Sequence, residues 1–212
     1  TRAGDADGHD RYWEMATSLL TDGQIADAFD VTHAPLREQE RYGRNSFGWS
    51  LLLAARLVQR GVRLVQVNLG NNETWDTHGN AFPHLRDNLF PPTDKALSAL
   101  LDDLAETGLL EQTLIVMAGE FGRTPKINGS GGRDHWAPLS TLAFAGGGLK
   151  MGQVIGESAE KVDVPKTTPI TPQDLMATVF DVLGFDKRIQ FTNQSGRPTY
   201  MIETGRPIEE LV

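Results

Sequence analysis

Hydrophobic residues recur at helical spacing in three segments of the chain. Residues 46–61, 94–108 and 171–184 carry apolar positions three and four residues apart, and each segment reaches a glycine, a residue that often ends a helix. Ser46 and Thr171 stand at the starts of the first and third segments, where a hydroxyl side chain can cap a helix. The pattern therefore predicts three helices.

Short apolar runs follow the first two predicted helices, and a third run lies farther along the chain. Their ranges are 62–70, 113–119 and 139–148. Their length and their β-branched or continuous apolar character are typical of strands. Because strands separated by helices of this length usually form parallel sheets, we expect an α/β fold with a central, mostly parallel sheet and helices on both faces.

Length and composition fit one globular domain. The 212 residues are 39% hydrophobic and 23% charged, which suffices for a sizeable core. The strongly apolar stretches, such as residues 51–58, are far shorter than the roughly 18 residues that a membrane span requires. Within one domain, we expect peripheral helices over residues 1–45, a sheet core over 46–185 and a polar tail over 186–212.

Charge and cysteine content narrow the chemistry. The net charge is −8, and no run of Lys or Arg exceeds two residues, which argues against a nucleic-acid surface or a polybasic membrane tether. An anionic substrate would need local positive charge from a metal or an arginine. Because the chain has no cysteine, metal ligands must come from His, Asp and Glu.

Polar clusters flank all three predicted strands. NNETWDTHGN follows the first, EFGRTPK follows the second, and GRDHWAP precedes the third. Ligands of α/β sheets bind at the loops after the strand ends, so we expect these clusters to meet. A mixed set of imidazoles and carboxylates suits a divalent metal, zinc or manganese first and calcium as a further option. The predicted ligands are Asp76, His78, Glu120, Asp134 and His135.

Each of these residues also has a structural interpretation. Asp76 could cap the following helix, and His135 could bond a backbone carbonyl. Glu120 could form an ion pair with Arg123 or Arg133, because a carboxylate directly after a buried strand needs a partner. The occurrence of all the candidates beside the predicted strands favours the metal site.

The order of the motifs resembles a known family. W-D-T-H-G, G-E-F-G-R-T-P, G-R-D-H-W and P-I-T-P-Q-D-L-M-A-T-V-F-D-V-L-G look like the bacterial sulfatase-like family called domain of unknown function 1501, from about Ala28 to Leu211. That family is placed in the alkaline phosphatase superfamily, with phosphatases and sulfatases. The resemblance implies an α/β sandwich around a central mixed sheet, with a metal-assisted site at the strand ends.

The resemblance also implies roles for individual residues. Asp76, His78 and His135 match the ligands of one metal, and Glu120 matches an acidic ligand of a second, although Phe121 stands where a His often follows. Arg123 is expected to bind the anionic ester, since a planar guanidinium can hold two oxygens.

One part of the superfamily pattern has no counterpart here. The nucleophile and the remaining ligand of the second metal come from an N-terminal strand and helix, and no segment of this sequence matches them. We therefore expect the chain to be the C-terminal portion of a longer protein. The resemblance implies export, often through a twin-arginine-type signal, and these residues contain no such signal.

Two functional hypotheses follow. The first is a metal-dependent hydrolase that acts on a small phosphate or sulfate ester. The alternative is a non-catalytic metal-binding or structural module of the same fold.

Overall fold

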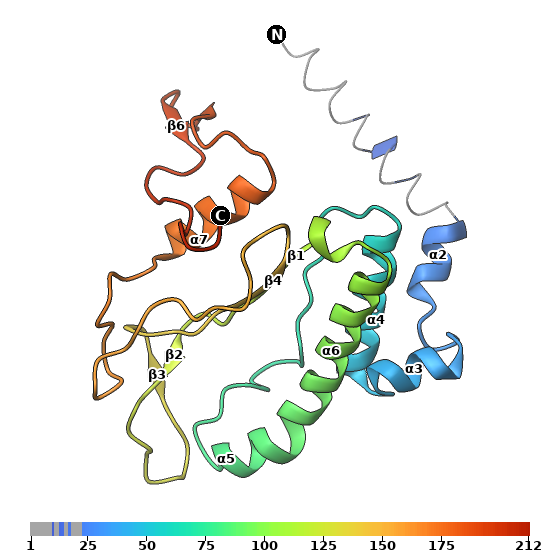
Figure 1. Ribbon diagram of the computed structural model, residues 1–212, viewed down its shortest axis with the longest axis horizontal. Helices are drawn as coiled ribbons and strands as arrows, with labels where there is room; N and C mark the ends of the chain where they lie inside the picture. The colour runs from blue at the N-terminus through green and yellow to red at the C-terminus, as the bar shows by residue number, and fades with distance from the viewer. Residues whose placement is uncertain (1–9, 11–12, 15–16, 18–22) are drawn as a thin grey trace. The chain divides into compact units, whose positions relative to one another are not determined.

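A computed structural model gives the architecture of residue 10, residues 13–14, residue 17 and residues 23–212 (Figure 1). Most of the helical pattern expected before residue 23 lies outside the described residues. The chain divides into two compact units. The first comprises Thr1–Trp75 and Leu85–Asp103, and the second comprises Asp76–His84 and Leu104–Val212.

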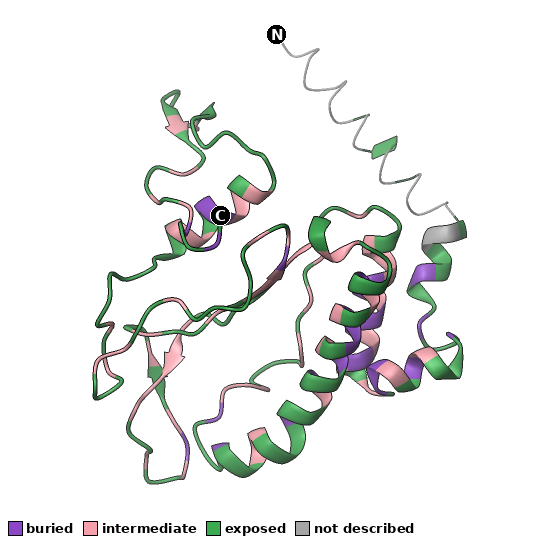
Figure 2. Ribbon diagram, in the orientation of Figure 1, coloured by how far each residue is buried: buried purple, intermediate pink, exposed green. Residues whose placement is uncertain are grey.

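The first unit is helical. Its elements from residue 23 onward are α2 (Gly23–Phe29), α3 (Leu36–Tyr42), α4 (Ser46–Gln59), the π-helical turn η1 (Leu85–Leu89) and most of α6 (Phe90–Glu106). The core of this unit draws on one face of α4, where Leu51, Leu52, Ala54 and Ala55 are buried (Figure 2). The spacing of these residues places them on one stripe of the helix, as the sequence pattern predicts.

The helices of the first unit also meet through a polar contact. The hydroxyl of Tyr42, at the end of α3, donates to a carboxylate oxygen of Asp103 in α6 at 2.7 Å. Arg41 forms an ion pair with the other oxygen of Asp103, also at 2.7 Å. Burial of the ring raises the pKa of Tyr42 far above its usual value, which keeps the hydroxyl protonated and able to donate.

The second unit carries the strands and α7. Its elements are α5 (Ala81–His84), η2 (Leu110–Gln112), β1 (Leu114–Met117), β2 (Gly122–Arg123), β3 (His135–Trp136), β4 (Ala143–Gly146), α7 (Pro172–Val182), β5 (Gln190–Thr192) and β6 (Pro198–Tyr200). They form three antiparallel pairs, β1 with β4, β2 with β3, and β5 with β6. In the second unit β2 and β3 project as a short ribbon beyond the β1–β4 pair (Figure 1).

The expectation of a central, mostly parallel sheet with helices on both faces, as in the alkaline phosphatase superfamily, is wrong. The chain leaves β1, turns back through β2 and β3, and enters β4, which pairs antiparallel with β1 and without a crossover helix between them. Residues 62–70 form no strand, and Leu64 is 86% exposed. An alternating pattern indicates which face a strand would bury, but it does not supply the neighbour that accepts its hydrogen bonds.

The three predicted helices are confirmed, with one change of cap. Thr171 and Asp174 form a capping box at the start of α7, and Pro172 follows the cap. At α4 the side chain of Asn45, not that of Ser46, accepts from the Gly48 amide at 3.0 Å. Among the described residues, no helix is both long and apolar enough to cross a membrane.

Candidate metal centre

Two candidate ligands come from the segment that opens the second unit. Asp76 and His78 stand on either side of Thr77, which is buried. The His78 amide donates to the Asp76 carbonyl at 3.0 Å, which turns the chain between them. The two functional side chains therefore lie close together while Thr77 anchors the segment.

The third candidate ligand comes from the β2–β3 ribbon. His135 begins β3 and lies directly opposite Arg123 of β2 in the antiparallel register. Cross-strand neighbours place their side chains side by side. Accordingly, Nε2 of His135 and Nη2 of Arg123 each lie 2.7 Å from Oδ1 of Asp76.

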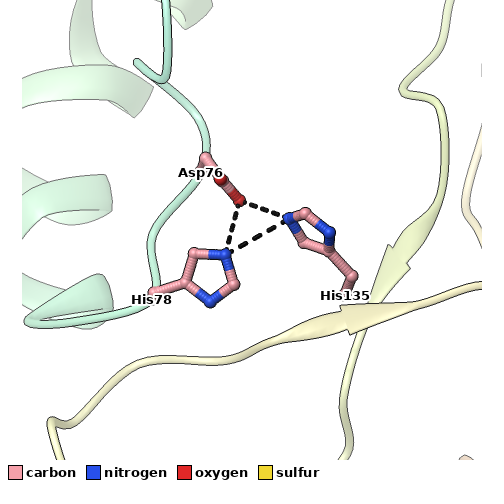
Figure 3. A group of neighbouring side chains, drawn as sticks. All are labelled: Asp76, His78 and His135. Atoms are coloured by element: carbon pink, nitrogen blue, oxygen red, sulfur yellow. Dashed lines mark hydrogen bonds and ion pairs between the residues drawn. The ribbon is translucent and has the colours of Figure 1, made fainter.

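The three side chains converge on one point (Figure 3). Nε2 of His78 lies 3.1 Å from Oδ1 of Asp76 and 3.2 Å from Nε2 of His135. Two imidazole nitrogens and one carboxylate oxygen form a donor set that zinc and related divalent ions accept, and three protein ligands leave a coordination position open. The residues therefore fit one divalent metal, and the imidazoles, 46% and 48% exposed, are accessible from solution.

The charges of this group are arranged to keep Asp76 ionised. The hydrogen bond from His135, followed by that from Arg123, lowers the pKa of Asp76 to about 2. A carboxylate in that state offers its lone pairs to a cation across the physiological pH range. This property is what a metal ligand requires.

Asp134 contacts the ring of His78 and is outside the three converging ligand atoms. Its Oδ1 lies 2.7 Å from Nδ1 of His78, on the side of the ring opposite Nε2. Because a carboxylate accepts, Nδ1 carries the proton and Nε2 of the neutral ring is left with its lone pair. Asp134 thus orients a candidate ligand, as carboxylates commonly do for metal-bound histidines. The same bond raises the pKa of His78 and lowers that of Asp134.

Glu120 stands apart from the converging group. It is exposed in the turn after β1 and is absent from the set of ligand atoms that meet at Asp76. The two arginines that the sequence offered as partners for Glu120 contact other groups. Arg123 bonds Asp76, and Arg133 donates to the carbonyls of Thr124 and Pro125 at 2.6 and 2.8 Å.

Two features of the site have no clear signal in the sequence. The ring of Phe121 packs on that of His135, with centroids 4.2 Å apart. Phe121, at the position where the family resemblance suggests a histidine, therefore buttresses the candidate ligand His135. Asn128 donates to the carbonyl of His78 and to Asp134, at 2.9 and 3.0 Å. A single Asn in a glycine-containing loop indicates a turn, and nothing in its neighbours predicts these two partners.

The glycine-containing loop, residues 124–134 between β2 and β3, is hydrogen-bonded to the segment that bears His78. The amides of Asn80 and Ala81 donate to the carbonyls of Ser130 and Gly131 at 2.9 and 3.1 Å. Gly132 lies so close that a Cβ would overlap the main chain of His78. These contacts bring the two ligand-bearing segments together.

Comparison with known proteins identifies a family. A protein-family model described as Protein of unknown function (DUF1501) matches residues 1–212. Comparisons with curated proteins and with solved structures gave no match. The family description names no reaction, metal or substrate.

Proposed function

The chain belongs to the DUF1501 family, and we propose that it is a metal-dependent hydrolase of phosphate or sulfate esters. The observation that carries the proposal is the convergence of Asp76, His78 and His135, whose ligand atoms lie 2.7 to 3.2 Å from one another. A divalent ion bound there supplies Lewis-acid polarisation of an ester oxygen and lowers the pKa of water.

The residues of the site have separate tasks in this proposal. Asp76 contributes the anionic ligand, and the two histidines contribute neutral nitrogens, that of His135 after metal binding displaces the proton that it donates to Asp76. Asp134 holds the proton of His78 on Nδ1, so that Nε2 stays available. Arg123 borders the same point and brings a positive charge that favours an anionic ester in a chain whose net charge is −8.

The ester class comes from the motif resemblance to phosphatases and sulfatases. It does not depend on the sheet architecture, which differs from the expected one. Zinc and manganese are the favoured ions, because both accept imidazole and carboxylate ligands.

A non-catalytic metal-binding module is the second candidate. The observation that favours it is the position of Arg123, whose guanidinium bonds Asp76 and also donates to the Arg133 carbonyl at 3.3 Å. An arginine held by the protein in this way is less available to grip an ester.

The test combines metal analysis with an ester screen. The chain, purified without chelator and then loaded with zinc or manganese, is assayed on para-nitrophenyl phosphate and para-nitrophenyl sulfate. We expect bound metal and turnover in the wild type, and loss of both in His135→Ala. His33→Ala is the matched control, because His33 also lies beside an aspartate, at 2.6 Å from Asp30, in the first unit. Metal binding without turnover would favour the non-catalytic module, and unchanged metal content in His135→Ala would refute the site.

A further inference from the structure

Asn128 lies in the loop between β2 and β3, and its side-chain carboxamide makes four hydrogen bonds. Its Oδ1 accepts from the amides of Ser130 and Gly132, both at 3.0 Å. Its Nδ2 donates to the carbonyl of His78 at 2.9 Å and to Oδ1 of Asp134 at 3.0 Å. One side chain therefore connects the glycine-containing loop to the metal centre.

The orientation of this amide is set by its partners. Backbone N–H groups only donate, whereas a carbonyl and an ionised carboxylate only accept. A reversed amide would place its NH₂ against two donors and its oxygen against two acceptors. All four bonds therefore form only when Oδ1 faces the two loop amides and Nδ2 faces His78 and Asp134.

The two bonds from Nδ2 hold both ends of His78. One fixes the main chain from which the imidazole projects, at the His78 carbonyl. The other fixes Asp134, whose Oδ1 also accepts from Nδ1 of the imidazole at 2.7 Å. With its main chain and its Nδ1 both held, the ring directs Nε2 to the point shared with Asp76 and His135.

A second turn in the same unit, at Asn193, has the same hydrogen bonds to its side-chain oxygen but no bond from its NH₂ group to a candidate metal ligand. Oδ1 of Asn193 accepts from the amides of Ser195 and Arg197 at 2.9 and 3.0 Å. The main-chain amide of each asparagine donates to the carbonyl four residues later at 2.9 Å, to Gly132 from Asn128 and to Arg197 from Asn193. The Nδ2 of Asn193 donates to Thr199 at 3.3 Å, inside its own hairpin.

This comparison distinguishes the role of the Asn128 side-chain oxygen from that of its NH₂ group. The oxygen builds the turn, as it does in the Asn193 turn. The NH₂ group is what differs, because only at Asn128 does it reach a metal ligand and the carboxylate that orients that ligand.

We propose that Asn128 is a positioning residue for the metal ligand His78, an inference that rests on the metal site of the proposed function. Its NH₂ group holds the His78 main chain and Asp134 together, and so keeps Nε2 of His78 aimed at the ion.

Asn128→Asp removes the NH₂ group and puts a carboxylate oxygen in its place. The variant keeps an oxygen for the two loop amides and sets a second oxygen against the His78 carbonyl and Asp134. We expect the affinities for Zn²⁺ and Co²⁺ to fall about 10- to 100-fold, as for other groups that orient metal ligands. The absorption spectrum of bound Co²⁺ should also change. Asn193→Asp, which makes the same exchange in the matching turn, should leave both properties as in the wild type.

A second measurement needs no metal. Heteronuclear NMR of the imidazole nitrogens, at a pH where His78 is neutral, should show the proton on Nδ1 in the wild type and in Asn193→Asp. Asn128→Asp should show a mixture of the two tautomers, because Asp134 is no longer held. A folded Asn128→Asp protein with wild-type ion affinity, Co²⁺ spectrum and tautomer would overturn the inference.

The outcomes distinguish this inference from the proposed reaction. Wild-type protein that binds the ions and hydrolyses neither ester refutes the hydrolase, and the effect of Asn128→Asp on affinity still stands. Wild-type protein that binds neither ion refutes the metal site and this role of Asn128 with it.

Discussion

Gly132 lies against the main chain of His78 with no room between them for a side chain. Gly132→Ala should therefore push apart the loop and the segment that bears His78, because a Cβ would overlap backbone atoms that cannot rotate away. We expect the Zn²⁺ affinity to fall about 10- to 100-fold, as for other changes that disturb ligand orientation. Isothermal titration with Zn²⁺ measures the effect. Gly129→Ala is the control, because a Cβ there meets nothing within 4 Å, and equal losses in both variants would contradict the explanation.

Asp134 and Glu120 should differ sharply when each carboxylate is replaced by its amide. Asp134→Asn replaces the charged acceptor of the Nδ1 proton of His78 with a weaker, neutral amide oxygen, so the Zn²⁺ dissociation constant should rise about 10- to 100-fold. Glu120→Gln should leave Zn²⁺ binding unchanged, since Glu120 stands outside the converging group. Competition with a colorimetric chelator gives both constants. A large effect of Glu120→Gln would bring Glu120 back into the site.

Arg123→Gln should raise the pKa of Asp76 in the metal-free protein. The bonds from His135 and Arg123 lower that pKa from 3.8 to about 2, and loss of the guanidinium removes the second of these two causes. We therefore expect a partial return toward 3.8, since the bond from His135 remains. An NMR titration of the Asp76 carboxyl carbon follows the change. A pKa that stays at the wild-type value would show that Arg123 does not stabilise the ionised form.

The capping box of α7 predicts a loss of stability in acid. The bond from the Thr171 hydroxyl, then that from the Arg206 amide, lowers the pKa of Asp174 below its unfolded value of 3.8. A lowered folded-state pKa stabilises the fold fully above the unfolded pKa, and the contribution disappears as pH falls through the folded value. Asp174→Asn should therefore be less stable than the wild type at neutral pH, with the difference vanishing in acid. Urea unfolding at the two pH values checks this, and a difference independent of pH would contradict it.

Tyr42→Phe should destabilise the first unit. The change removes the bond from a buried hydroxyl to Asp103, whose carboxylate keeps its ion pair with Arg41. A hydrogen bond to a charged group is worth about 1.5 to 3 kcal/mol, and we expect a loss in the free energy of unfolding near the lower end. Urea unfolding measures the loss. Tyr200→Phe, at an exposed tyrosine, is the control and should change stability little.

The sequence predicts helices well because their signals are local. The cap, the first-turn proline and the apolar stripe of α7 all lie within Thr171–Leu183, and the structure has each of them. The strand β1 is also where the apolar run places it, but its partner and direction depend on residues about 30 positions away. Residues 62–70 show the limit most clearly, because their alternating pattern is that of a strand and they form none.

The candidate metal centre can be predicted in part. Asp76, His78 and His135 are residue types that bind metals, and their motifs stood out in the sequence. The contact between Asp134 and Nδ1 of His78 could not be predicted, because an aspartate in such a motif has the same sequence signature whether it would contact an ion or orient an imidazole. The role of Asn128 is harder still to predict, since its partner His78 lies 50 residues earlier in the chain.

The near-half exposure of both imidazoles bears on the kinetics of ion exchange. An ion held at such an accessible point can leave and return without global unfolding of the polypeptide. Dialysis against a chelator should remove it under native conditions. Because the affinity of such a site follows the general order of divalent ions, the ion bound should depend on which metals the surroundings supply.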